Sequence, residues 1–212
     1  MSELVMKTQF WLLSLGALLV INIAWLYKTK HNNQLYNQRL TDSRAHYIEV
    51  NRELSQINKG CEYAIKTDHR VLSGSIRVKS LENASGMLDD YLGESEKLIL
   101  VVSDHHCSTC VDQILFLVKN EIAEQKRDQV LVLFSKESSS EEQWNHRQKI
   151  LPGVQFLEIQ YQSLRLPMDS LGIPYFFQAG IEHLVFQAFA PYPALELQTK
   201  GYLNEIDKRL IN

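Results

Sequence analysis

The sequence predicts an α/β domain, with a mixed central sheet and helices on both faces, preceded by an N-terminal transmembrane helix and a helical stalk. Three observations support this prediction. An uncharged apolar run extends from Phe10 to Tyr27, and a polar stretch without Pro or Gly follows at residues 33–59. Beyond it, short apolar runs alternate with amphipathic segments. We therefore expect a membrane anchor at residues 1–30, a stalk at 31–62 and the α/β domain at 63–212.

The apolar run has the composition of a membrane anchor. Phe10 to Tyr27 contains 18 residues, which is near the lower limit for crossing the hydrocarbon core. Trp11 lies at one end and Trp25 at the other, as interfacial aromatic residues do. The run ends in bulky residues rather than in a small-x-small cleavage site. This favours an uncleaved single-pass signal-anchor over a cleaved signal peptide.

The charges beside this run do not settle its orientation. Lys7 precedes it, whereas Lys28 and Lys30 follow it, so the positive-inside rule leans toward a cytoplasmic C-terminal domain. The difference is a single charge. The chemistry of the domain, described below, favours the opposite side, and we expect an extracytoplasmic domain at the cell (inner) membrane.

Apolar residues in the stalk recur at alternating steps of three and four, as in a coiled coil. They are Tyr36, Leu40, Tyr47, Val50, Leu54 and Ile57, with one break at Ser43. The same register reaches Cys61, and Gly60 is expected to end the helix. Two alternatives remain open. The stalk forms a parallel homodimer with a disulfide between two copies of Cys61, or it packs on its own domain and Cys61 is an inert thiol.

Periodicity and turn residues predict the elements of the α/β domain. Apolar runs typical of buried strands lie at residues 98–102, 130–134 and 154–159. Amphipathic segments predict helices at residues 81–92, 107–127, 138–151 and 195–210. Turn residues predict hairpins that join residues 70–72 to 76–78, and 175–178 to 183–189. The segment Trp144 to Arg147 is expected on an exposed helix face.

Two cysteines lie where the first buried strand meets the following helix. Cys107 and Cys110 are separated by two residues, so they lie one turn apart on the same helical face. Unpaired N–H groups and the positive end of the helix dipole favour a thiolate at such a position. We predict that Cys107 attacks a disulfide and that Cys110 resolves the product.

This CxxC, together with Gly172-Ile173-Pro174 ahead of the second hairpin, resembles the thioredoxin fold over residues 98–210. With the anchor and the added β pair, the chain looks most like the membrane-anchored bacterial thioredoxin-like proteins of the TlpA type, which are thiol–disulfide oxidoreductases. The resemblance implies a cis Pro174 beside the dithiol. It also implies that the backbone of Ile173 pairs with an extended substrate.

The motif departs from the family pattern on both sides of the first cysteine. His106 stands where an aromatic residue is usual, and Ser108 where proline is frequent. A protonated His105 or His106 near Cys107 would stabilise its thiolate and make the disulfide more oxidising. The acidic residue that assists proton transfer in the family has no clear counterpart, and Asp104 and Glu137 are candidates by position alone.

The expected function is membrane-tethered thiol–disulfide exchange, as a reductase or isomerase acting on disulfides of exported proteins. No cofactor is expected. Because the chain has no nucleotide-binding motif, a membrane electron-donor protein has to supply the electrons. A net charge of −3 without a cluster of basic and aromatic residues argues against nucleic acid as a partner.

Two other functions use the same residues. The two nitrogens and two sulfurs of His105, His106, Cys107 and Cys110 suit Cu(I) or Zn(II), as in a thioredoxin-like copper chaperone. Alternatively, the two cysteines form a permanent structural disulfide in a binding module without catalytic activity.

Overall fold

The structure is a computed structural model that describes residues 2–73, 75–82, 84–93, 95–103, 105–135, 141–160, 162–192 and 195–210. For residues 2–10, 12–14 and 181 it describes the backbone alone. Contacts divide the chain into two units, residues 1–54 and 55–212.

Helix α1 (Ser2–Thr67) makes up the described residues of the first unit, and its last turns, from residue 55 on, belong to the second unit. The stalk residues Tyr36, Tyr47 and Leu54 are exposed on it, and the coiled-coil dimer stays a prediction. Within the described part of the chain, no helix combines the length and the apolar character needed to cross a bilayer. The side chains of residues 10 and 12–14, in the predicted span, lie outside the described residues.

Gly60 does not end the helix as predicted, since α1 continues to Thr67. Its role is to make room for a side chain. The hydroxyl group of Tyr192 donates a hydrogen bond to the carbonyl oxygen of Gln56 at 2.7 Å. A Cβ atom on Gly60 would lie only 2.6 Å from that hydroxyl oxygen. The glycine therefore allows Tyr192 to contact the helix backbone.

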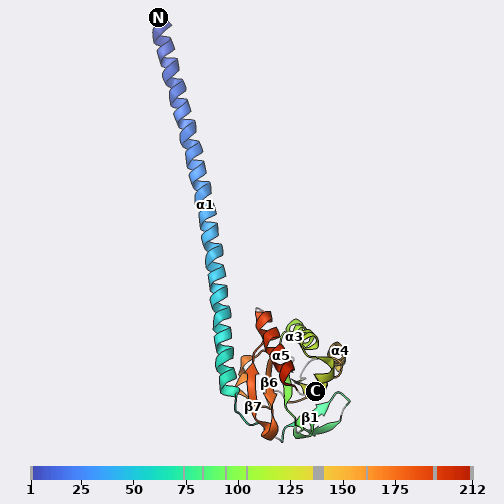
Figure 1. Cartoon of the computed structure of the whole chain (residues 1–212). Helices are drawn as coiled ribbons and strands as arrows, with labels where there is room; N and C mark the ends of the chain where they lie inside the picture. The colour runs from blue at the N-terminus through green and yellow to red at the C-terminus, as the bar shows by residue number, and fades with distance from the viewer. Residues whose placement is uncertain are drawn as a thin grey trace. The chain divides into compact units, whose positions relative to one another are not determined.

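The second unit is built on a seven-stranded sheet in the order β2-β1-β5-β4-β3-β6-β7 (Figure 1). Strands β3, β4 and β5 are parallel to one another, and the remaining pairs are antiparallel. The strands are β1 (Arg77–Ser80), β2 (Ser85–Met87), β3 (Lys97–Ser103), β4 (Val130–Ser135), β5 (Gln155–Glu158), β6 (Tyr175–Ala179) and β7 (Val185–Phe189).

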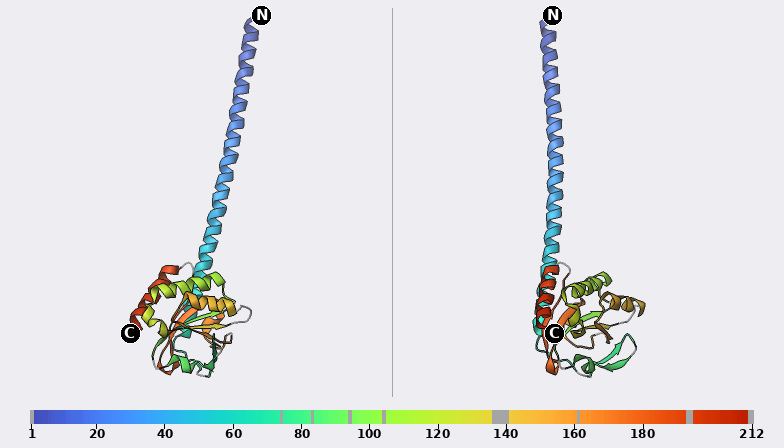
Figure 2. Two further views of the ribbon diagram at one scale, coloured as in Figure 1. Left: turned by 90° about the vertical axis from the view of Figure 1, so that its right-hand side faces the viewer. Right: turned by 45° about the vertical axis from the view of Figure 1, so that its right-hand side comes forward.

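Helices cover both faces of this sheet, and Figure 2 shows them from two further sides. One face packs against α3 (Ser108–Glu121), α4 (Glu141–Ile150) and α5 (Glu196–Arg209). The other face packs against α2 (Asp89–Leu92), the short helix η2 (Pro167–Leu171) and the last turns of α1. This arrangement confirms the predicted thioredoxin-like α/β fold with a mixed sheet.

The first predicted hairpin is placed wrongly. Val71 forms only an isolated bridge with Leu184, and the hairpin consists of β1 and β2, one element later in the chain. Residues 81–92, predicted as a helix, contain β2 and the short α2. The apolar residues that suggested the earlier pair, Leu72 and Ile76, are buried in the core. Their pattern reflects packing rather than strand pairing.

Candidate active site

Cys107 is the N-cap residue of α3, directly after the turn that leaves β3. Its Sγ atom accepts a hydrogen bond from the backbone N–H of Cys110 at 3.3 Å. Cys107 is exposed and Cys110 is partly buried, and both are free thiols. A sulfur atom in the N-cap position replaces the usual serine or aspartate oxygen, so the helix offers its free N–H groups to the thiol.

The two thiols have opposite acidities. Hydrogen bonds from the side chain and then the backbone of Cys110 lower the pKa of Cys107, while burial and the charge of Asp112 oppose this effect. Burial raises the pKa of Cys110 to about 11, with a further contribution from Cys107. At neutral pH, Cys107 is therefore the thiol that loses its proton more readily, and Cys110 keeps its own.

His106 does not supply the positive charge that was predicted near Cys107. Its Nδ1 atom accepts a hydrogen bond from the backbone N–H of Ser103 at 3.1 Å. Burial, followed by the charge of His105, lowers the pKa of His106 to about 4. The ring is thus neutral at neutral pH and orders the loop before the dithiol. His105 is exposed on the same loop.

Pro174 lies beside the dithiol, but its peptide bond differs from the one that the resemblance implied. No peptide bond in the described residues is cis. The chain turns instead at Gly172, whose φ of 66° and ψ of 24° are left-handed, a conformation that costs little only for glycine. The cis form is therefore not needed to bring Ile173 and Pro174 to the site.

A cavity of about 460 Å³ brings the predicted residues together. The two cysteines, Ile173 and Pro174 share its wall with side chains from α3 and from the segment that leads into α5. Most of these are apolar: Ile114, Phe116, Leu117, Pro191 and Tyr192; the polar ones are Gln113, Glu196 and Thr199. A groove of this character beside a reactive thiol suits an apolar stretch of a polypeptide.

A partly buried acid near the site was missed in the sequence. Asp169, in η2, lines a small cavity together with His106 and Tyr175. The hydroxyl group of Tyr175 donates a hydrogen bond to Asp169 Oδ1. Burial nevertheless raises the pKa of Asp169. No motif marks this residue. The acids suggested by position, at 104 and 137, lie outside the described residues.

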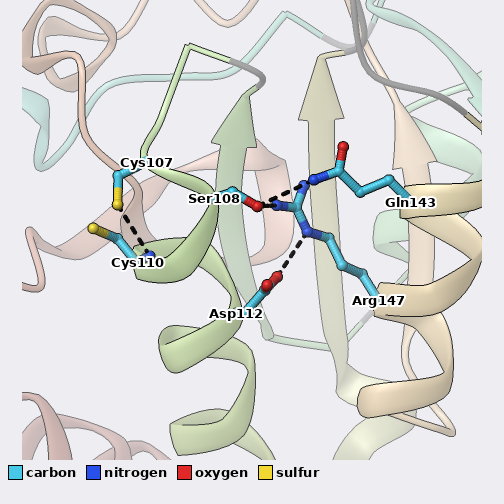
Figure 3. A network of polar contacts seen from close by, with 6 residues as sticks. All are labelled: Cys107, Ser108, Cys110, Asp112, Gln143 and Arg147. Carbon is cyan, nitrogen blue, oxygen red and sulfur yellow. Dashed lines mark hydrogen bonds and ion pairs between the residues drawn. The ribbon is translucent and has the colours of Figure 1, made fainter.

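A second missed residue is Arg147, which was expected on an exposed face of α4. Its side chain is only 3% exposed. Arg147 Nε pairs with Asp112 Oδ1 at 2.9 Å, and Nη2 donates to the hydroxyl oxygen of Ser108 at 3.0 Å. Figure 3 shows this network beside the two cysteines. It fixes Ser108, the residue that stands where the family frequently has proline.

The metal alternative gains no geometric support from the described residues. Among them, no group of three or more His, Cys, Asp or Glu side chains is arranged to hold a metal ion. Nδ1 of His106 already accepts the hydrogen bond from Ser103.

Comparisons with known proteins provide fold neighbours but no family. No protein-family model matches the sequence, and no curated protein matches it. Among solved structures, a secreted disulfide oxidoreductase of Mycobacterium tuberculosis is 8% identical, with a TM-score of 0.45 over 62% of this chain and 96% of that one. A thiol:disulfide interchange protein from Bacteroides sp. is 17% identical, with a TM-score of 0.44 over 66% and 88%.

Copper-bound ScoI of Arabidopsis thaliana is 13% identical, with a TM-score of 0.44 over 65% of this chain and 99% of that one. These neighbours differ in the activities that their names state. At such identities and TM-scores they say nothing about the activity of this chain, and its function has to be inferred from the site itself.

Proposed function

We propose that the protein catalyses thiol–disulfide exchange through Cys107 and Cys110. The observation that carries this proposal is the pairing of the two thiols at the start of α3. Cys107 caps the helix and has a lowered pKa, while Cys110, one turn later, keeps its proton. This is the asymmetry that an attacking thiolate and a resolving thiol require.

Reduction of a substrate disulfide then proceeds in two exchanges. The thiolate of Cys107 attacks one substrate sulfur, breaks the substrate S–S bond and releases the other sulfur as a thiolate. Cys110 loses its proton to solvent and attacks Cys107 Sγ, which breaks the mixed disulfide and releases the second substrate thiolate. The substrate gains two electrons and the Cys107–Cys110 pair loses two. Isomerisation uses the first exchange and its reversal.

The cavity beside the dithiol is the proposed docking surface for the substrate. Its apolar wall suits the residues that flank a disulfide in an unfolded or partly folded protein. Ile173 lies between the left-handed Gly172 and the start of β6. Its backbone is the proposed pairing partner for an extended substrate segment.

The proposed setting is that of TlpA-type proteins. The run from Phe10 to Tyr27 would hold the protein in the cell (inner) membrane, with the α/β domain on the extracytoplasmic side, where disulfides of exported proteins form. A membrane electron-donor protein would reduce the Cys107–Cys110 disulfide after each cycle. An alkaline phosphatase fusion after Lys59 tests this orientation. Active phosphatase is expected, and an inactive fusion that is stably produced would place the domain in the cytoplasm.

Reduction of insulin disulfides by the full-length protein tests the activity, with dithiothreitol as the electron source. The wild-type protein is expected to accelerate precipitation of the insulin B chain, and Cys107→Ser is expected to reduce the rate to the dithiothreitol background. Cys61→Ser serves as the matched control and should retain the wild-type rate. If Cys107→Ser retained the activity of the wild-type protein, the proposed function would be wrong.

A further inference from the structure

Arg147 connects α4 to the turn that carries the dithiol. Its guanidinium group pairs with Asp112 and donates to the hydroxyl oxygen of Ser108. Gln143, one turn earlier on α4, donates to the same hydroxyl oxygen at 3.1 Å. Both partners on α3 belong to the active-site turn: Ser108 lies between the two cysteines, and Asp112 follows Cys110 by two residues (Figure 3).

The guanidinium group is held firmly in this position. It stacks on the ring of Trp144, with Cζ 4.4 Å from the ring centroid, and the ring itself is fully buried. A buried guanidinium group that loses its carboxylate partner is strongly unfavourable, because an unpaired charge then remains in a medium of low dielectric constant. The pairing of Arg147 with Asp112 is therefore a fixed feature of the fold.

The pairing matters to the dithiol because of the charge on Asp112. Hydrogen bonds from the side chain and backbone of Cys110 lower the pKa of Cys107, and the Asp112 carboxylate opposes this shift. The guanidinium group of Arg147 pairs with this carboxylate and compensates part of its negative charge. Among the described residues, the other titratable groups around the dithiol are His105 and His106 ahead of it in the chain, and Tyr192 and Glu196, which line the same cavity.

We propose that Arg147 is a positioning residue for disulfide exchange: by holding Ser108 and Asp112, it keeps the Cys107 thiol ready to ionise. This inference rests on the proposed function and assigns a role to the serine between the two cysteines. The hydroxyl group of Ser108 accepts hydrogen bonds from Gln143 and Arg147 on α4. A proline at this position has no hydroxyl group and could not accept them.

The test is the pH dependence of Cys107 alkylation by iodoacetamide in the full-length protein, in a Cys61→Ser background, with each site quantified by mass spectrometry. Arg147→Met leaves the Asp112 charge uncompensated. It should raise the pKa of Cys107 by about half a unit, which is about a threefold loss of thiolate below that pKa. Asp112→Asn should lower this pKa, and Asp112→Asn combined with Arg147→Met should abolish the increase. A purely structural role of Arg147 would not produce this suppression.

Arg127→Met is the matched control. Arg127 is also buried, and it donates to the carbonyl oxygen of Lys119 near the other end of α3, at 2.8 Å. Its removal should change stability but not the titration of Cys107. The inference is overturned if Arg147→Met titrates as the wild-type protein does, or if Arg127→Met shifts the titration equally.

Asp112→Asn also covers the case in which Arg147→Met does not fold, because Asp112 is partly exposed and the amide oxygen of asparagine can still accept the hydrogen bond from Arg147 Nε. An unchanged titration in Asp112→Asn would overturn the inference by itself. Alkylation needs no substrate, so the two proposals fail separately. If the wild-type protein reduces insulin but Cys107 titrates in Arg147→Met and Asp112→Asn as it does in the wild type, only the role of Arg147 is refuted. A wild-type protein that cannot reduce insulin refutes the proposed function whatever the titrations show.

Discussion

The Sγ atom of Cys107 accepts the backbone N–H of Cys110 across the first turn of α3. This hydrogen bond links the two cysteines while both are still free thiols. The two thiols are unequal because a hydrogen bond from the Cys110 side chain, and then this backbone contact, lower the pKa of Cys107 by favouring its charged form. Cys110 gains no comparable stabilisation and is partly buried.

The inequality predicts which thiol reacts first. At pH 7, iodoacetamide should modify Cys107 at least about tenfold faster than Cys110, because the pKa of Cys107 is lowered and that of Cys110 is raised to about 11. Below the pKa of Cys107 its rate should fall about tenfold for each unit of pH. Peptide mapping after brief labelling measures both rates. Preferential labelling of Cys110 would contradict the assigned roles.

The lowered pKa of His106 predicts that the stability of the protein depends on pH. Its pKa in the folded protein is about 4, below the usual value of 6.5, so the unfolded chain binds the proton more tightly. The stabilisation is fully present above pH 6.5 and is lost as the pH falls toward 4. We expect a loss of about 3 kcal/mol across this window, measured by denaturant unfolding.

His106→Asn is the control for this prediction, since its amide oxygen can accept the same N–H of Ser103 without titrating. The difference between the wild-type protein and His106→Asn should grow in favour of the variant as the pH falls. Parallel pH profiles for the two proteins would show that His106 is not the titrating group.

Gly60 predicts a steric effect on stability. In Gly60→Ala the new Cβ atom would lie 2.6 Å from the hydroxyl oxygen of Tyr192, and relief of the clash should cost about 1–3 kcal/mol. Gly201→Ala is the matched control. It also lies in a helix, α5, and nothing lies within 4 Å of the position that its new methyl group would take. That variant should gain about 0.5–1 kcal/mol. Equal changes in the two unfolding midpoints would argue against the contact.

The stalk predicts a covalent dimer under oxidising conditions. If the heptad pattern pairs two copies in parallel, the exposed Cys61 side chains face each other at one core position. A non-reducing gel should then show a band of twice the monomer mass that Cys61→Ser removes. Sedimentation of the reduced protein as a monomer would favour the alternative, a stalk that packs on its own domain and leaves Cys61 an inert thiol.

The sequence predicted the buried strands well because a short, continuous apolar run between polar segments is typical of a strand covered on both faces. Strands β3 and β4 fall almost where residues 98–102 and 130–134 were expected. The position of the dithiol at a helix start was predicted because the apolar residues change from a continuous strand run to helical spacing after residue 102. Short elements were harder. Leu72 and Ile76 are apolar because they fill the core, and an alternating pattern over so few residues does not distinguish packing from pairing.

The parts of the site that escaped prediction depend on contacts between distant residues. Arg147 lies 39 residues from Ser108, and no local pattern reveals that a helix rich in polar residues buries its guanidinium group. The neutral state of His106 follows from its burial, which the sequence does not encode locally. Asp169 likewise gains significance only because the fold places it near His106.

Capture of a mixed disulfide tests the central claim most directly. In Cys110→Ala the second exchange is blocked, so a disulfide-bearing substrate such as insulin should remain covalently attached to Cys107. The account predicts an adduct that dithiothreitol releases and that Cys107→Ser combined with Cys110→Ala does not form. If Cys110→Ala formed no adduct, or formed it equally well without Cys107, the proposed exchange chemistry would be contradicted.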